Sequence, residues 1–155
     1  MTATRKILYV DMDNVLVDFP TAFPRLPPDI FAKYENEERL DEIPGIFALM
    51  DPIADAVGSY HELSEIFDTY ILSTSPWENP SAWSDKLQWV KCHLGRPAYK
   101  RLILSHHKTL NAGHFLIDDR TKNGVDRFAG EHIHFKSAAF PDWPAVVRYL
   151  RDRVT

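Results

Sequence analysis

The stretch "ILYVDMDNVLVDF", residues 7–19, places aspartates directly behind a run of apolar, β-prone side chains. Residues 7–10 have the composition of a buried strand. Asp11 and Asp13 follow that strand with a single residue between them. A carboxylate beside a hydrophobic strand is costly to desolvate unless a cation or a set of hydrogen bonds receives it. The stretch therefore predicts a polar site at the end of the first strand.

Further segments along the chain repeat the pattern of a buried strand. Short runs rich in β-branched or aromatic residues occupy 69–75, 101–106, 114–119 and, more weakly, 131–137. Amphipathic helical patterns lie at 54–67, 79–94 and 142–154. Strands that alternate with helices predict an α/β fold with a doubly wound, mostly parallel sheet of Rossmann-like type and helices on both faces.

The segment 20–53 interrupts this alternation directly after the first strand. Its first part, "PTAFPRLPPDI" (20–30), contains four prolines, which exclude both a helix and a central strand. Its second part, "DIFAKYENEERLDEI" (29–43), is compatible with a short helix. We expect 20–53 to be a small cap insertion over the edge of the sheet, within a single domain that spans 1–155.

Bulk composition limits the function classes. A chain of 155 residues with 45% apolar composition builds one globular core. The net charge of −4 argues against binding to a nucleic-acid polymer, which needs a basic face. No apolar run approaches the roughly 20 residues of a membrane span. A single cysteine, Cys92, and an N-terminal "MTATRK" without an apolar segment predict a cytoplasmic protein.

Oxygen-bearing side chains stand at the ends of three predicted strands: Asp11 and Asp13, Thr74 and Ser75, and Asp118 and Asp119. In an α/β sheet, ligands bind outside the carboxyl ends of the strands, so these side chains should meet at one edge. Four neighbouring carboxylates repel one another unless a cation lies between them. Hard oxygen ligands select Mg²⁺, which binds carboxylates together with water and phosphate oxygens. The two hydroxyl groups can donate hydrogen bonds to a phosphate.

A phosphate site of this kind also needs a fixed positive charge. Lys86 lies beside the apolar stripe of the helix predicted at 79–94, about 10 Å from its start at 1.5 Å per residue. Lys108, directly after the strand predicted at 101–106, competes for the same role. Spacing alone leaves both lysines open.

Four motifs in order resemble a known family. They are "DMDNVLVDF" (11–19), "TSP" (74–76), "DKLQWVKCHLG" (85–95) and "LIDDR" (116–120). The set is similar to the haloacid-dehalogenase superfamily of phosphohydrolases and, more narrowly, to its 5'(3')-deoxyribonucleotidases (cytosolic type C 5'-nucleotidases). The chain departs from them at Asn14, where Gly is usual, although Asn also tolerates a left-handed backbone. The segment between the first two motifs is also shorter than theirs.

The resemblance implies Mg²⁺-dependent hydrolysis of nucleoside monophosphates to nucleoside and phosphate. Asp11 would attack phosphorus and form an aspartyl-phosphate, and Asp13 would serve as the general acid and base. The metal would be held by Asp11, the backbone carbonyl of Asp13, and the acidic pair Asp118 and Asp119. Contacts to the substrate would come from Lys86, which the resemblance favours over Lys108, and from Thr74 and Ser75. Phe19 would flank the sugar or base, or pack in the core.

Other functions remain to be weighed. A phosphatase of the same superfamily acting on another phosphomonoester, such as a sugar phosphate, fits the same motifs, as does a non-catalytic member that binds phosphate. A response-regulator receiver is disfavoured because its lysine follows the acidic motifs, whereas here both lysines precede Asp118. An EF-hand is excluded because Leu16 stands at the sixth loop position and Phe23 at the twelfth.

The seven histidines are assigned to structure or solvent, because His132 and His134 share a strand face without a third ligand at useful spacing.

The aromatic residues of the insertion should either pack on the core or stack on a base; they are Phe23, Phe31, Tyr34 and Phe47. Since a short, proline-rich cap encloses a nucleotide incompletely, we expect loose base discrimination. A homodimer, in which a neighbouring subunit completes the pocket, stays open.

Overall fold

The computed structural model of the chain describes residues 3–155. Met1 and Thr2 of the segment "MTATRK" lie outside the described residues. No helix within 3–155 combines the length and the apolar character that a membrane crossing requires.

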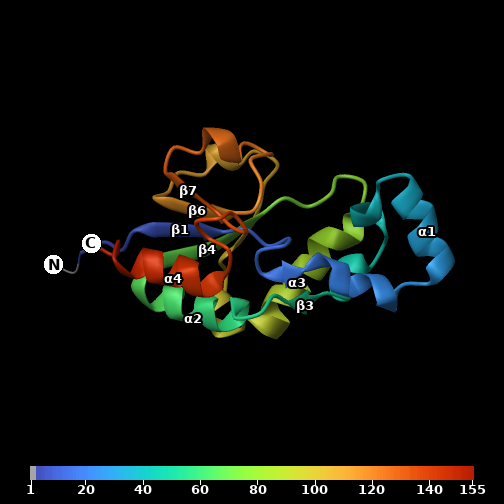
Figure 1. Cartoon of the computed structure of the whole chain (residues 1–155), viewed down its shortest axis with the longest axis horizontal. Helices are drawn as coiled ribbons and strands as arrows, with labels where there is room; N and C mark the ends of the chain where they lie inside the picture. Colours follow the sequence, from blue (N-terminus) through green and yellow to red (C-terminus); the bar gives the residue numbers. More distant parts are fainter. Residues whose placement is uncertain (1–2) are drawn as a thin grey trace.

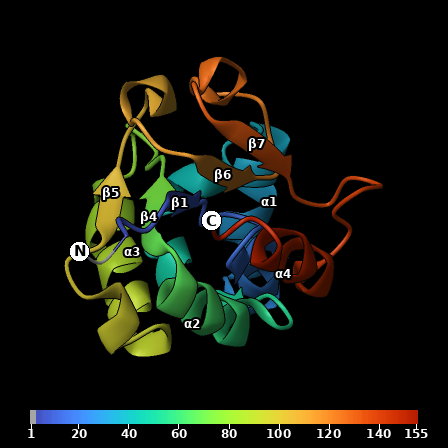
Figure 2. The same cartoon turned by 90° about the vertical axis from the view of Figure 1, so that its left-hand side faces the viewer.

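A five-stranded parallel sheet forms the centre of the fold (Figures 1 and 2). The strands are β1 (Ile7–Val10), β4 (Asp68–Ser73), β5 (Leu102–Leu104), β6 (Phe115–Asp118) and β7 (Glu131–His134). Their order across the sheet is β5-β4-β1-β6-β7, so the strand that opens the chain lies in the middle. The predicted α/β class with a parallel sheet is confirmed. Four of these strands fall within the ranges that the sequence pattern indicates, and β4 begins one residue before its range, at Asp68.

The α-helices outside the segment between β1 and α2 (Ala56–Ile66) cover one face of the sheet. They are α2, α3 (Pro80–His93) and α4 (Trp143–Arg151), and their buried side chains join Leu8 and Val10 of β1 in the larger core cluster. α3 begins with Pro80 at a first-turn position, and Gly95, with a φ of +65°, follows its end. Figure 2 shows α2 and α4 side by side beneath the sheet.

Among residues 3–155, no α-helix covers the other face, although the alternating pattern predicts helices on both faces. Tyr9, Leu72 and Leu116 point to this face and pack against Val125 and Phe128. The connections that cross it contain only the short 3₁₀ segments η5 (Lys108–Leu110) and η6 (Val125–Arg127). These connections, 105–114 and 119–130, are near the length of about a dozen residues that a parallel crossover requires, so they leave no room for a long helix.

The segment between β1 and α2 forms a separate lobe beside the sheet, at the right of Figure 1. A two-stranded antiparallel ladder closes its base, where β2 (Val17–Asp18) pairs with β3 (Asp51–Pro52). Between them lie α1 (Pro28–Asn36) and the 3₁₀ segments η1 (Phe19–Arg25), η2 (Leu40–Glu42) and η3 (Ile46–Ala48). We call residues 19–50 the insertion.

The proline-rich start of the insertion is helical, which corrects the expectation that four prolines exclude a helix. Residues 19–25 form a 3₁₀-helix with Pro20 near its start and Pro24 inside it. A proline in the first turn removes no required hydrogen bond, because the donors there have no partner within the helix. The short helix expected within 29–43 is present as α1, which begins one residue earlier, at Pro28.

The aromatic residues of the insertion pack on one another and on the core. Phe47 is buried, and Phe23 lies 5.0 Å from Phe31 between ring centroids. Phe23, Phe31 and Tyr34 are partly buried against the larger core cluster. Of the two outcomes predicted for these rings, packing on the core is therefore the one observed.

Candidate active site

The carboxyl ends of β1, β4 and β6 meet at one edge of the sheet, as the strand order requires. They line a cavity of about 640 Å³, together with residues of the insertion. From the sheet edge come Asp11, Asp13, Ser75, Asp118 and Asp119. The predicted convergence of the strand-terminal oxygens on one edge is thus present in the structure.

Three carboxylates form the most compact acidic group of this edge. Asp11, Asp118 and Asp119 each offer an oxygen, and these oxygens lie within 4.8 Å of one another. Burial raises the pKa of Asp118 to about 7, and the neighbouring charge of Asp11 adds to this effect. Burial and Asp11 also raise the pKa of Asp119. Crowded carboxylates of this kind, with hard oxygen donors, fit a divalent metal ion such as Mg²⁺.

Lys108 lies between two of these carboxylates. Its Nζ donates to Asp11 Oδ1 at 2.9 Å and to Asp118 Oδ2 at 2.6 Å, and the side chain is 3% exposed. Burial lowers the pKa of Lys108, but the charges of Asp11 and Asp118 outweigh burial and raise it. The side chain reaches this position because η5 begins shortly after β5 ends, at the carboxyl edge of the sheet.

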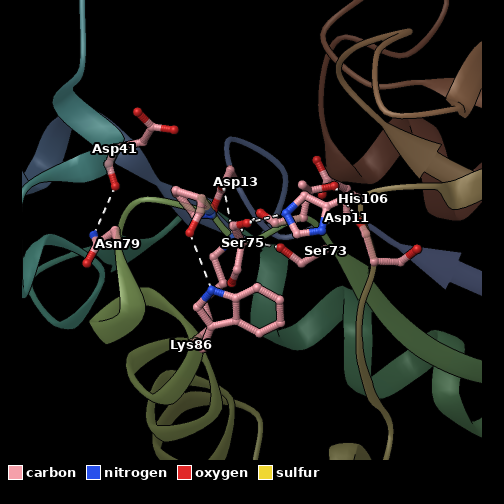
Figure 3. A network of polar contacts seen from close by, with 12 residues as sticks. Asp11, Asp13, Asp41, Ser73, Ser75, Asn79, Lys86 and His106 are labelled. Carbon is pink, nitrogen blue, oxygen red and sulfur yellow. Dashed lines mark hydrogen bonds and ion pairs between the residues drawn. The ribbon is translucent and has the colours of Figure 1, made fainter.

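Lys86 lies in a different place, beneath Asp13. Its Nζ donates to Asp13 Oδ2 at 3.2 Å, to Ser73 Oγ at 2.8 Å and to the carbonyl oxygen of Thr74 at 2.7 Å. It also stands 4.6 Å from the ring centroid of Phe47 in the insertion. Lys86 is fully buried and, unlike Lys108, does not line the cavity. Figure 3 shows Lys86 in the network with Asp13 and Ser73.

Asp13 has one carboxylate oxygen bound and one free. Oδ2 accepts the bond from Lys86, whereas Oδ1 is buried without a hydrogen-bond partner among residues 3–155. Burial raises the pKa of Asp13, Lys86 opposes this effect, and Asp11 adds to it. The loop that carries Asp13 turns at Asn14, which has a φ of +58°. The left-handed backbone that the sequence allows at Asn14 is therefore present.

The two hydroxyl groups after β4 differ in their contacts. Thr74 Oγ1 donates to the carbonyl oxygen of Ser105 at 2.7 Å, so its proton is already used. Ser75 Oγ is fully buried, lines the cavity and has no partner within the described part of the chain. His106 Nε2 lies 2.9 Å from the carbonyl oxygen of Ser75 and holds this loop against β5 (Figure 3).

Two histidines support the acidic pair from behind. His132 Nε2 lies 2.9 Å from the carbonyl oxygen of Asp118, and His134 Nε2 lies 3.0 Å from that of Asp119. Their rings stack at 5.2 Å between centroids. Both histidines therefore hold the backbone that presents the two carboxylates, in agreement with the structural role expected for them.

The sequence reasoning missed several residues of the cavity. Trp77 is 73% exposed at its mouth, and Arg120 and Lys122 line it near the acidic pair. The adjacency of Trp77 to the "TSP" motif and of Arg120 to Asp119 is a usable signal. Phe19, which the sequence analysis names, lines the cavity and also packs edge-on against Phe23 and Phe47.

Comparison with known proteins agrees with this geometry. Residues 30–142 match the family described as "5' nucleotidase, deoxy (Pyrimidine), cytosolic type C protein". The chain belongs to this family. The resemblance read from the four motifs is confirmed, and the protein is a hydrolase of phosphoric monoesters.

Two curated relatives and one solved structure are similar over most of the chain. A "Putative 5'(3')-deoxyribonucleotidase" of Vibrio phage KVP40 is 58% identical over 94% of this chain and 85% of its own. The human "5'(3')-deoxyribonucleotidase, cytosolic type" is 31% identical over 81% of this chain and 77% of its own. A haloacid-dehalogenase-like hydrolase from Xanthomonas campestris, 11% identical, superposes with a TM-score of 0.58 and covers 99% of both chains. This last likeness shows the fold alone.

Proposed function

We propose that the protein is a Mg²⁺-dependent 5'(3')-deoxyribonucleotidase that hydrolyses nucleoside monophosphates through an aspartyl-phosphate on Asp11. The observation that carries the proposal is the convergence of Asp11, Asp118 and Asp119 with the buried ammonium of Lys108 in one cavity. The names of the relatives support a nucleotide as the substrate.

The donor set at the sheet edge suits Mg²⁺. Asp11, Asp118 and Asp119 would hold the ion, together with the backbone carbonyl of Asp13. When bound, the ion would offset the repulsion between these carboxylates and the phosphate of the substrate.

Asp11 is the proposed nucleophile. One of its oxygens would attack phosphorus and expel the sugar oxygen, and the resulting acyl-phosphate would then be hydrolysed by water. The bond from Lys108 to Oδ1 fixes the rotation of this carboxylate. The covalent route divides one difficult displacement into two easier ones.

Asp13 is the proposed general acid and base. Its raised pKa favours the protonated form, and its buried Oδ1 has no competing partner in the described chain. The proton would pass to the leaving 5' or 3' oxygen, and the carboxylate formed would then take a proton from the attacking water. Lys86 would keep Asp13 in place through Oδ2.

The contacts of the two lysines support different roles from the one that the motif resemblance suggests. Lys108 lines the cavity beside the nucleophile, so we assign to it the stabilisation of charge on the phosphate oxygens. Ser75 Oγ, buried and unpartnered, would add a donor to the same oxygens, with Thr74 beside it. Phe19 would flank the sugar or the base.

We also assign the segment 20–53 the role of a small cap, because α1 and η2 contribute residues to the same cavity. A cytoplasmic location is proposed on the lone cysteine and on the "cytosolic type" of the human relative.

The test is turnover of a substrate panel with Mg²⁺ and after treatment with EDTA. We expect hydrolysis of deoxynucleoside monophosphates, loss of activity in EDTA and recovery when Mg²⁺ is restored. A strong preference for a sugar phosphate would overturn the nucleotidase proposal and leave the Asp11 mechanism standing. Failure to hydrolyse p-nitrophenyl phosphate as well would point to a non-catalytic phosphate-binding member.

A further inference from the structure

The wall of the cavity that faces the sheet edge is acidic. Glu35, Glu38 and Asp41 of the insertion line the same cavity as Asp11. We call these three residues the acidic rim. Catalysis at the sheet edge gives them no role, because the proposed metal and phosphate contacts come from other residues. Their position suits the part of a nucleotide that lies farthest from the phosphate.

Charge pairing separates the acidic rim from its neighbours. Within the insertion, Arg39 pairs with Glu37 at 2.6 Å and with Glu42 at 2.5 Å. Neither of these two glutamates lines the cavity. Over residues 3–155, by contrast, the carboxylates of the acidic rim form no ion pair. The chain thus neutralises the carboxylates outside the cavity and leaves those in it available to a ligand.

The backbone that carries Asp41 is fixed. Asn79, 1% exposed, donates through Nδ2 to the carbonyl oxygens of Asp41 and Ile43, both at 3.0 Å. Ser81 Oγ donates to Asn79 Oδ1 at 2.6 Å and accepts the amide N–H of Gly45 at 3.0 Å. Figure 3 shows Asp41 bound to Asn79 on one side of the network and Asp11 on the other. Because η2 is bound to the start of α3, the backbone of Asp41 is held in place, and its carboxylate projects from a fixed point.

The cavity therefore has two distinct ends. Ser75 Oγ, buried and without a partner, marks the end that would receive an anion, beside Lys108. Toward the insertion, the apolar side chains of Phe19 and Leu40 line the cavity together with the acidic rim. Apolar surfaces with a few polar acceptors are what the faces and the edge of a nucleobase require.

We propose that the acidic rim, with Asp41 on its fixed backbone, selects nucleobases that carry an exocyclic amino group, and that cytosine is favoured over uracil and thymine. This inference rests on the proposed nucleotidase function. An ionised carboxylate only accepts hydrogen bonds, so the 4-amino group of cytosine can donate to it. Uracil and thymine carry a carbonyl oxygen at that position, which a carboxylate repels. The selection is narrower than the loose discrimination that a short insertion suggests.

Base selection of this kind has a measurable size. A well-placed pair between a side chain and a base edge is worth about 1–3 kcal/mol of discrimination, which corresponds to roughly tenfold to hundredfold in kcat/KM. Repulsion of the wrong base contributes to specificity alongside attraction of the right one.

The test compares dCMP with dUMP, which share ring size, sugar and phosphate. We would measure kcat/KM with Mg²⁺ for the wild type, Asp41→Asn, Glu38→Gln and Glu35→Gln. Glu37→Gln is the matched control, because Glu37 is next to the acidic rim but paired with Arg39 outside the cavity. We expect the wild type and the control to prefer dCMP by roughly tenfold or more.

In Asp41→Asn we expect the ratio to fall toward one, with kcat/KM for dUMP rising, because the amide can donate to O4. A variant that merely damages the fold would lower both values, so this rise separates recognition from structure. A wild-type ratio near one, or a ratio that survives all three rim substitutions, would overturn the assignment of the acidic rim while nucleotide hydrolysis itself persists. If p-nitrophenyl phosphate is hydrolysed and neither nucleotide is, the nucleotidase proposal fails first.

Discussion

The two walls of the cavity treat their carboxylates in opposite ways. At the sheet edge, Asp11 and Asp118 share the buried Lys108, and Asp13 is paired with Lys86. In the insertion, the cavity-facing Glu35, Glu38 and Asp41 are exposed. Buried charges must be paired, whereas exposed ones are solvated by water. The carboxylates of the first wall are thus paired before a ligand binds, whereas those of the second wall remain available to interact with the ligand.

The largest effect is expected from the nucleophile. Asp11→Asn should abolish turnover, because an amide oxygen cannot form the acyl-phosphate. The fold should survive, since Lys108 keeps its bond to Asp118. Steady-state kinetics, with circular dichroism as the check on folding, test this. A near-normal rate in this variant would show that Asp11 is not the nucleophile.

The second effect concerns Asp13. Asp13→Asn keeps the backbone carbonyl and the position beside Lys86 but removes the carboxyl group that would give and take the proton. A positioned acid and base is worth about 10²- to 10⁴-fold in rate, so the loss should fall in that range. The loss should be smaller for p-nitrophenyl phosphate, which has a good leaving group, than for a nucleoside monophosphate. Equal losses for both substrates would contradict a general-acid role.

The sheet-edge wall is the part that the sequence predicts well. Short runs rich in β-branched and aromatic residues locate the strands, and parallel strands bring their carboxyl ends to one edge of the sheet. This geometry alone brings Asp11, Ser75 and Asp118 together before any side-chain contact is known. The sequence does not decide between Lys86 and Lys108 as the lysine that contacts the phosphate. Helix spacing gives the position of Lys86 along α3 but not whether its ammonium enters the cavity or lies beneath Asp13.

The insertion is the part that the sequence predicts poorly. Its prolines forbid an ordinary helix interior but permit the 3₁₀ turn of residues 19–25. Its aromatic residues identify a packed lobe but do not say that Phe23 packs on Phe31 instead of on a ligand. Pairing decides which carboxylates stay free, and Arg39 selects Glu37 and Glu42 through local backbone geometry. No periodic pattern encodes that selection.

The third prediction separates the two buried lysines. Lys108→Met removes the cation beside the nucleophile, and loss of one preorganised donor at a developing charge costs about 10²- to 10³-fold in kcat. Lys86→Met should lower kcat less for p-nitrophenyl phosphate than for a nucleoside monophosphate, because the effect of Lys86 passes through Asp13. Both rates would be measured on variants checked by thermal melting. The reverse order of damage would return the phosphate contact to Lys86, as the motif resemblance suggests.

The smallest effect is a pH dependence of stability that only the buried wall should produce. Burial, with Asp11 nearby, raises the folded-state pKa of Asp118 from 3.8 to about 7, so the folded protein binds this proton more tightly than the unfolded chain does. The contribution to stability is then fully present below the unfolded pKa and is lost as the pH rises through about 7. In EDTA, the melting temperature should therefore fall as the pH rises from about 4 to about 7.

Asp118→Asn should flatten this slope, because the amide does not titrate. Its single carbonyl oxygen can still accept the bond of Lys108, while the bond of the Arg120 amide, which goes to the other carboxylate oxygen, is lost. Asp41→Asn is the control on the opposite wall and should keep the slope, since its carboxylate is exposed. His132, whose pKa is lowered by burial, acts in the opposite direction at low pH, so the difference between wild type and variant is the quantity to read. If the two variants changed the slope equally, the carboxylates of the two walls would share one electrostatic environment, and the contrast between a paired wall and a free one would not hold.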